Sequence, residues 1–136
     1  MAGYSNAPLA RKLGFKDGHQ VALLGPVPTG LKDALCLDAP ATKIMTRAAK
    51  QQDVIVWFVT DMSTLNGDFV EMTKRLPQHG ALWVAWPKRA SKVKTDITED
   101  VVREIALPRG WVDTKVCAID EKWSGLRLTM RVALRA

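Results

Sequence analysis

Four cations lie within seven residues of the chain, in the run Lys88–Lys94 (KRASKVK). The run follows an apolar segment, Ala81–Trp86, that has the composition of a buried strand. Further on, Asp96 and Glu99 have the spacing of a capping box at a helix start. Cations beside a helix N-terminus favour an anion, because unpaired N–H groups and the helix dipole add to their charge. The run therefore predicts an anion-binding site, with a solvated lysine loop as the alternative.

The candidate ligand-binding residues lie at, or just after, the C-terminal ends of expected strands. Open α/β sheets bind their ligands at this edge, near the switch in strand order. Pro87 should hold Lys88 and Arg89 close to the sheet, so these two cations should contribute most to binding. Lys92 and Lys94 should lie further out. The full set of candidates is Gly25, Thr60, Asp61, Trp86, Lys88 and Arg89.

Motifs for catalysis or metal binding are absent from the sequence, which has no GxSxG, HExxH or CxxC spacing and no paired histidines. Three aspartates, Asp61, Asp96 and Asp120, are isolated, and carboxylates at such positions usually cap helices or turns. Cys36 and Cys117 are expected to be buried, reduced thiols. We therefore expect no catalytic residue, no metal and no cofactor, which favours a protein that is not an enzyme.

The loop Gly25–Gly30 (GPVPTG) follows the first expected strand, where many α/β proteins hold a phosphate. It lacks both GxGxxG and the P-loop pattern, and Pro26 and Pro28 remove two backbone donors. Thr29 is expected to cap the next helix, so the sequence favours a tight strand-to-helix turn. After the second expected strand stands Arg47, where a ribose-binding protein would place a carboxylate.

The central elements lie between residues 53 and 88. Val54–Val59 and Ala81–Trp86 are short, evenly apolar runs, which indicates strands buried on both faces. Between them, apolar residues at helical spacing predict a helix with Ser63 as its N-cap and Pro77 at its end. A strand, a helix and a second buried strand predict a right-handed βαβ unit and hence a parallel sheet.

Flanking segments supply the remaining elements of a single α/β domain, residues 1–136. The connection between the last two expected strands is so short that they must be antiparallel to one another. Residues 126–132 alternate apolar and polar side chains, which indicates a strand with one poorly covered face. Further strands are expected at 20–24, 43–46, 111–119 and 125–132, and further helices near 8–13, 29–38 and 97–107.

The composition argues against a disordered chain and against a membrane protein. A hydrophobic content of 47% argues against disorder, and a net charge of +6 favours anionic partners, although the cations are spread along the whole chain. No apolar run approaches the roughly 18 residues of a membrane span, and the N-terminus lacks a signal-peptide core, so we expect a cytoplasmic protein. Trp57 and Trp83 are expected in the core. Only Trp86 and Trp123 could be exposed, too few for the stacking platform of a nucleic-acid binder.

Several segments carry a resemblance to a known family, and together they span nearly the whole chain. They are GYSxxPLxxKLG at residues 3–14, VALLG at 21–25, GALWVAWPK at 80–88, TEDVVREIALP at 98–108 and KVCAIDEKWSGLR at 115–127. These segments resemble a family of small bacterial proteins of unknown function. The resemblance implies a cytoplasmic bacterial protein and supplies no activity.

The order of elements is also similar, more distantly, to the core of class I methyltransferases that use S-adenosylmethionine. Residues 53–88 match its fourth and fifth strands, and 111–132 match its terminal antiparallel hairpin. The chain departs from this pattern in the glycine-rich loop, in the acidic residue after strand two, and in lacking the third strand with its helix. Thr60 and Asp61 stand where that fold often places a residue facing its ligand.

The expected fold is therefore a three-layer, Rossmann-like α/β domain. Its six strands form a mostly parallel sheet with a C-terminal antiparallel hairpin. The resemblance to methyltransferases implies the strand order 2-1-3-4-6-5. The alternation at residues 126–132 favours a plain edge hairpin instead, with the order 2-1-3-4-5-6.

Three functions remain open at this point. The leading one is a non-catalytic module that binds an anionic small molecule or an acidic protein partner at the C-terminal edge of the sheet. The second is an enzyme with a nucleotide-like cofactor, a relic methyltransferase. The third is a non-specific nucleic-acid binder, which rests on charge alone.

Overall fold

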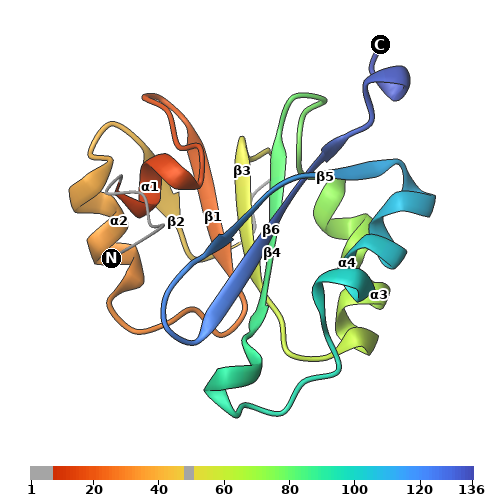
Figure 1. Ribbon diagram of the computed structural model, residues 1–136. Coiled ribbons are helices and arrows are strands. Elements are labelled where there is room, and N and C mark those ends of the chain that lie inside the picture. The colour runs from red at the N-terminus through yellow and green to blue at the C-terminus, as the bar shows by residue number, and fades with distance from the viewer. Residues whose placement is uncertain (1–7, 48–50) are drawn as a thin grey trace.

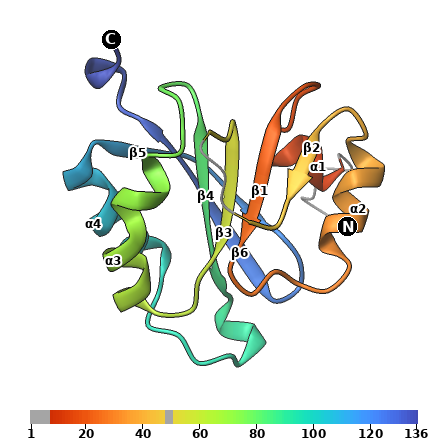
Figure 2. The ribbon, with the colours of Figure 1, turned by 180° about the vertical axis from the view of Figure 1, so that it is seen from behind.

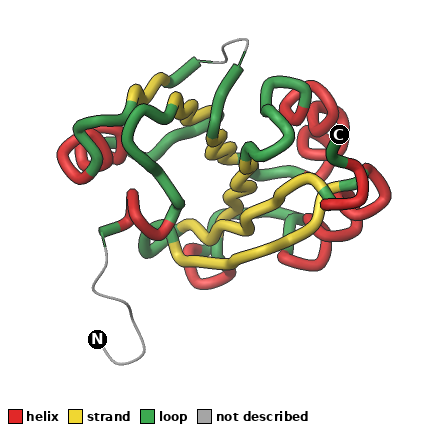
Figure 3. The backbone as a smooth tube through the Cα atoms, turned by 90° about the horizontal axis from the view of Figure 1, so that it is seen from above, coloured by secondary structure: helices red, strands yellow, loops and turns green. Residues whose placement is uncertain are grey.

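A computed structural model of the protein describes residues 8–47 and 51–136, so the motif residues 3–7 lie outside the described residues. One sheet separates two pairs of helices, which gives the expected three layers (Figure 1, Figure 2). In the view from above, the sheet runs between the two helical layers (Figure 3). On one face lie α1 (Leu9–Lys12) and α2 (Leu31–Asp38), and on the other lie α3 (Met62–Thr73) and α4 (Glu99–Ala106).

The described residues form a sheet of six strands, and each of them lies close to a strand expected from the sequence. The strand order is β2-β1-β3-β4-β6-β5, which confirms the order implied by the methyltransferase-like arrangement. The alternative, with β5 beside β4, is wrong. The strands are β1 (Gln20–Leu24), β2 (Lys43–Met45), β3 (Val54–Phe58), β4 (Ala81–Pro87), β5 (Trp111–Ala118) and β6 (Trp123–Met130).

The sheet is mixed, which corrects the expectation of a mostly parallel sheet. Pairs β2–β1, β1–β3 and β3–β4 are parallel, but β6 is antiparallel to both β4 and β5. The cause is the position of β6. The turn after β5 reverses the chain, and the reversed strand then lies between two strands that run the same way. It therefore forms two antiparallel pairs, where a hairpin at the edge would form one.

The same insertion explains the alternation in the last strand. Leu126 and Leu128 are buried in the core under α3 and α4, whereas Arg127 between them is only half-buried. An interior strand keeps an alternating pattern when one of its faces is covered only in part.

Trp83 on β4 holds α1 against the sheet. Its side chain is fully buried, and its indole N–H donates a hydrogen bond of 2.9 Å to the carbonyl of Leu13, which directly follows α1. On β6, Gly125 leaves room for the ring, because a Cβ there would lie 3.1 Å from the ring of Trp83 and 3.0 Å from Ile119. A four-residue helix has little stability of its own, so α1 depends on this contact and on the burial of Leu13.

Two helices begin at residues other than the expected N-caps. The cap of α3 is Asp61, not Ser63, and its carboxylate accepts hydrogen bonds from the N–H of Thr64 at 2.8 Å and from the Thr64 hydroxyl at 2.9 Å. A carboxylate is favoured there because its charge complements the helix dipole. The cap of α2 is Gly30, with φ of +83°, and Thr29 does not cap it. A glycine takes this left-handed conformation without the strain of a side chain.

We predict that Trp83→Phe lowers the free energy of unfolding by about 1–3 kcal/mol, because it leaves the buried Leu13 carbonyl without its donor. Trp83→Ala should cost more, about 3–5 kcal/mol, because it also leaves a cavity. Urea denaturation measures both. Trp57→Phe is the control, since the indole of Trp57 is buried in the opposite core and donates no hydrogen bond to the described residues. Equal losses for the two Phe variants would contradict the importance of this hydrogen bond.

Candidate anion-binding site

The candidate site lies at the edge of the sheet where β1, β3 and β4 end. All six residues expected there lie along this edge, but the structure places them in different surroundings. Gly25 follows β1, Thr60 and Asp61 follow β3, and the remaining three belong to the end of β4 and the loop after it.

Gly25 has a structural role. Its φ is +87°, and a Cβ would lie 2.0 Å from the carbonyl oxygen of Phe58, so only a glycine lets the end of β1 approach β3 this closely. The loop that follows uses its own donors: the N–H of Val27 donates to Gly25 at 2.8 Å, and that of Leu31 donates to Pro28 at 3.1 Å. Gly25 therefore shapes the edge, and these two N–H groups are already paired.

Thr60 and Asp61 border a cavity of about 330 Å³ that is also lined by Lys94, Thr95 and Asp96. The Thr95 hydroxyl donates to the carbonyl of Thr60 at 2.6 Å, which fastens the loop after β4 to the end of β3. The carboxylate of Asp61 is occupied as the cap of α3. Two carboxylates at one cavity disfavour an anion, so this part of the edge is not where an anion would bind.

Asp96 and Glu99 do not form the expected capping box. The carboxylate of Asp96 instead accepts from the N–H of Met62 at 2.7 Å, so it caps α3 and not α4. The cap of α4 is Thr98, whose hydroxyl accepts from the N–H of Val101 at 3.2 Å. Asp96 therefore accepts none of the N–H groups of α4 among these contacts.

The basic loop after β4 is held at its start by hydrogen bonds of the Lys88 backbone. The N–H of Lys88 donates to the carbonyl of Lys122 at 2.8 Å, and the hydroxyl of Ser91 donates back to the carbonyl of Lys88 at 2.6 Å. A short 3-10 turn, Arg89–Ser91, follows, and then Lys92 takes a left-handed backbone with φ of +62°. It is the only non-glycine residue with positive φ among residues 8–47 and 51–136. The loop has a defined path and is not simply an extended connection.

A second cavity, of about 430 Å³, lies between the end of β4 and the start of α4. Three cations line it, Arg89, Lys92 and Lys94, together with one carboxylate, Glu99. Lys88 does not line it, which differs from the expectation that Lys88 would matter more than Lys92 and Lys94. The left-handed turn at Lys92 reverses the loop, a feature with no signal in the sequence. The remaining lining residues are Trp86, Pro87, Val93, Thr95, Ile97 and Thr98.

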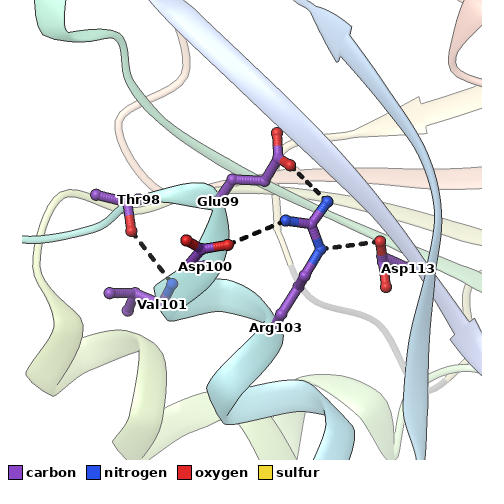
Figure 4. A network of polar contacts seen from close by, with 6 residues as sticks. All are labelled: Thr98, Glu99, Asp100, Val101, Arg103 and Asp113. Carbon is purple, nitrogen blue, oxygen red and sulfur yellow. Dashed lines mark hydrogen bonds and ion pairs between the residues drawn. The ribbon is translucent and has the colours of Figure 1, made fainter.

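Glu99 is paired with Arg103 and not with the cations of the loop. The guanidinium of Arg103 lies 2.5 Å from the Glu99 carboxylate, 3.2 Å from that of Asp100 and 3.0 Å from that of Asp113 on β5 (Figure 4). The hydrogen bonds with Asp113 and Glu99 raise the pKa of Arg103, and the one from Arg103 lowers the pKa of Asp113. The network fixes α4 to β5 and offsets the only negative charge lining the basic cavity.

The burial of the tryptophan and cysteine side chains differs in part from the expectation. Trp86 is buried, with 7% of its surface exposed, and Trp123 is half-buried with its ring edge-on to Phe58 at 5.0 Å. Neither offers an open stacking face. Cys36, expected to be buried, is exposed, because α2 turns it away from the apolar stripe that contacts the sheet; Cys117 is half-buried.

The described residues contain neither a metal-binding cluster nor a membrane-spanning helix. Within residues 8–47 and 51–136, no cluster of three or more His, Cys, Asp or Glu side chains is placed to hold a metal ion. In the same part of the chain, no helix combines the length and the apolar character needed to cross a membrane.

Comparison with known families and structures gives a family and a fold. Residues 10–132 match the model of a family described as "Protein of unknown function (DUF3052)". A search of curated proteins finds no match.

Several solved structures, most of them of methyltransferases, share the fold at low sequence identity. A methyltransferase dependent on S-adenosylmethionine from Aquifex aeolicus is 15% identical, with a TM-score of 0.58 over 88% of this chain and 86% of that one. The M1A22 tRNA methyltransferase TrmK of B. subtilis is 11% identical, with a TM-score of 0.59 over 96% of this chain and 68% of that one. The fibrillarin pre-rRNA processing protein of Methanococcus jannaschii is 14% identical, with a TM-score of 0.54 over 93% and 75%. The chain therefore has a methyltransferase-like Rossmann core.

We predict that Asp113→Asn lowers the melting temperature by a few degrees near neutral pH. In the folded protein the pKa of Asp113 lies below its usual value, so its contribution is complete above the unfolded pKa of about 4 and is lost as the pH falls through the folded pKa. The gap between wild type and variant should shrink in thermal melts as the pH falls below about 4. Asp100→Asn is the control, because Asp100 is 85% exposed and its contact with Arg103 is longer. A gap independent of pH would contradict the ion pair.

Proposed function

The chain belongs to the family described as "Protein of unknown function (DUF3052)", and we propose that it is a non-catalytic module that binds an anionic small molecule in the basic cavity beside β4. The observation that supports this proposal is the lining of that cavity by Arg89, Lys92 and Lys94. Its one carboxylate, Glu99, is already paired with Arg103. The positive charge of the cavity is thus free to act on a ligand.

The shape of the cavity favours an anion that also has an apolar part. Pro87 and Ile97 supply an apolar wall, and the cations stand on the loop that borders it. Binding would bury apolar surface as well as neutralise charge, and burial reduces the screening of an ion pair by solvent. A purely inorganic anion would use only the cations and should bind more weakly.

Methyl transfer is the second candidate, favoured by the fold alone. The residues that should cradle S-adenosylmethionine do not fit it: the loop after β1 pairs the N–H groups of Val27 and Leu31 internally, and the face of Gly25 is closed by Phe58. Arg47, not a carboxylate, follows β2. We therefore derive no reaction step through this cofactor. Nucleic-acid binding has the least support of the three candidate functions, because the aromatic side chains near the cavity are buried or half-buried and cannot stack on bases.

We predict that phosphate, sulfate and ATP raise the melting temperature of the wild type, with ATP the most effective at equal concentration. The triple variant Arg89→Ala/Lys92→Ala/Lys94→Ala should lose more than half of the shift. An anion bound to the folded state alone stabilises it by about 2.7 kcal/mol at a hundred times its dissociation constant, which is several degrees for a domain of this size. Thermal-shift titration at matched ionic strength measures the effect.

Lys88→Ala is the matched control for this titration, because Lys88 belongs to the same loop but does not line the cavity. It should behave as the wild type. Equal shifts in the wild type and the triple variant would reduce the loop to a solvated connection.

We predict no measurable binding of S-adenosylmethionine by calorimetry, since the loop after β1 offers neither the close-approach glycines nor a ribose carboxylate. A micromolar dissociation constant would overturn this expectation and move the enzyme to first place. The result is independent of the thermal-shift experiment, which probes a different part of the edge.

A further inference from the structure

A group of cations lies on a part of the sheet that α1 and α2 leave uncovered. These helices lie beside β1 and β2, while the hairpin of β5 and β6 faces the viewer in Figure 1. In the register of the sheet, Trp83, Arg127 and Lys115 are direct neighbours on β4, β6 and β5. Trp83 belongs to the core under α1, so Arg127 and Lys115 share that face. Arg127 is half-buried, and Lys115 is exposed.

Lys115 and Arg127 lie near the end of α1, whose last turn carries a third cation, Lys12. The ammonium of Lys115 donates to the carbonyl of Lys12 at 3.0 Å, and the guanidinium of Arg127 donates to the hydroxyl of Thr114 at 3.0 Å. A Cβ on Gly14 would lie 4.0 Å from Nε of Arg127, which places this side chain beside the residues that follow α1. Burial raises the pKa of the Cys117 thiol, and the nearby charges of Lys115 and Lys12 partly oppose that effect.

These charges have no counter-ion in the described part of the chain. The ion pairs found there are made by Lys74 and Arg103. Like charges directly opposite in an antiparallel pair destabilise it, and Arg127 and Lys115 are such a pair. Burial also lowers the pKa of Arg127. A half-buried guanidinium is normally paired, so the arrangement is suited to an anion supplied from outside.

We propose that Lys12, Lys115 and Arg127 form a docking surface for an acidic, extended segment of a partner protein. Their charge is complementary to such a segment, and they are spread over α1, β5 and β6, which suits an extended chain better than a single small anion. Side chains on one face of an extended segment repeat at about 7 Å, which lets several carboxylates meet cations on neighbouring elements. A nucleic acid is less suited, because Trp83 is buried and Trp123 half-buried on this face.

The probe is a fluorescein-labelled polyglutamate peptide, followed by fluorescence anisotropy at low salt. The wild type should bind it, and Lys115→Ala/Arg127→Ala should weaken binding by about tenfold or more. Lys32→Ala/Lys43→Ala changes the net charge equally but on exposed cations of α2 and β2, and should change binding by less than about twofold. The triple variant of the basic cavity should bind the peptide as the wild type does, which separates this surface from the proposed function.

Arg127→Lys keeps the positive charge but loses the planar guanidinium, so its affinity for the peptide should lie between those of the wild type and the double variant. This conservative variant serves as a control in case the double variant fails to fold. Equal weakening by the two double variants would overturn the proposal, because binding would then follow net charge. An oligonucleotide of matched charge that binds more tightly, with the same dependence on Arg127, would also overturn it in favour of nucleic acid.

Discussion

The hydrogen bond from the indole of Trp83 to the carbonyl of Leu13 joins the first helix to the central strand β4, 70 residues further along the chain. It secures a helix of four residues that could not persist alone. It also requires a glycine at position 125, so that the inserted strand β6 can pass the ring. With α1 held in this way, the carbonyl of Lys12 is positioned to accept from Lys115, and the cations of the hairpin gather at the helix end. One buried contact thus sets both the inner packing and the surface beside it.

The function that we propose for the domain rests on its cations and not on a reactive group. The carboxylates near the edge are used as structure: Asp61 and Asp96 cap α3, and Glu99 is held by Arg103. A methyltransferase-like core is therefore combined with a loop after β1 whose turn is closed by its own backbone. Fold and site are separable properties, and a fold shared with enzymes does not carry their chemistry when the cradle residues differ.

The strands that are buried on both faces, β3 and β4 above all, could be predicted from their evenly apolar runs, because such burial leaves a local pattern in the sequence. Strand order needed the resemblance, since the alternation in the last strand pointed to an edge. The N-caps of the helices were harder to predict. Asp61 and Ser63 can both accept hydrogen bonds at a helix start, and the structure has the charged residue, Asp61, as the N-cap of α3. The sequence placed all the candidate site residues near one edge of the sheet, but it could not show that Lys92 lines the basic cavity and Lys88 does not, because this depends on a left-handed turn. The structural role of Gly25 depends on a contact with a distant strand, which spacing cannot reveal.

The place of β6 also determines when the sheet can be completed during synthesis. β4 keeps one edge open until residues 123–130 have left the ribosome, and β5, although made earlier, has β6 as its sole neighbour in the described sheet. A nascent chain that ends before Trp123 therefore carries an unpaired, fully apolar strand edge, which is the kind of surface that recruits chaperones or aggregates. Sheet closure in this domain is a late event that depends on its most C-terminal strand.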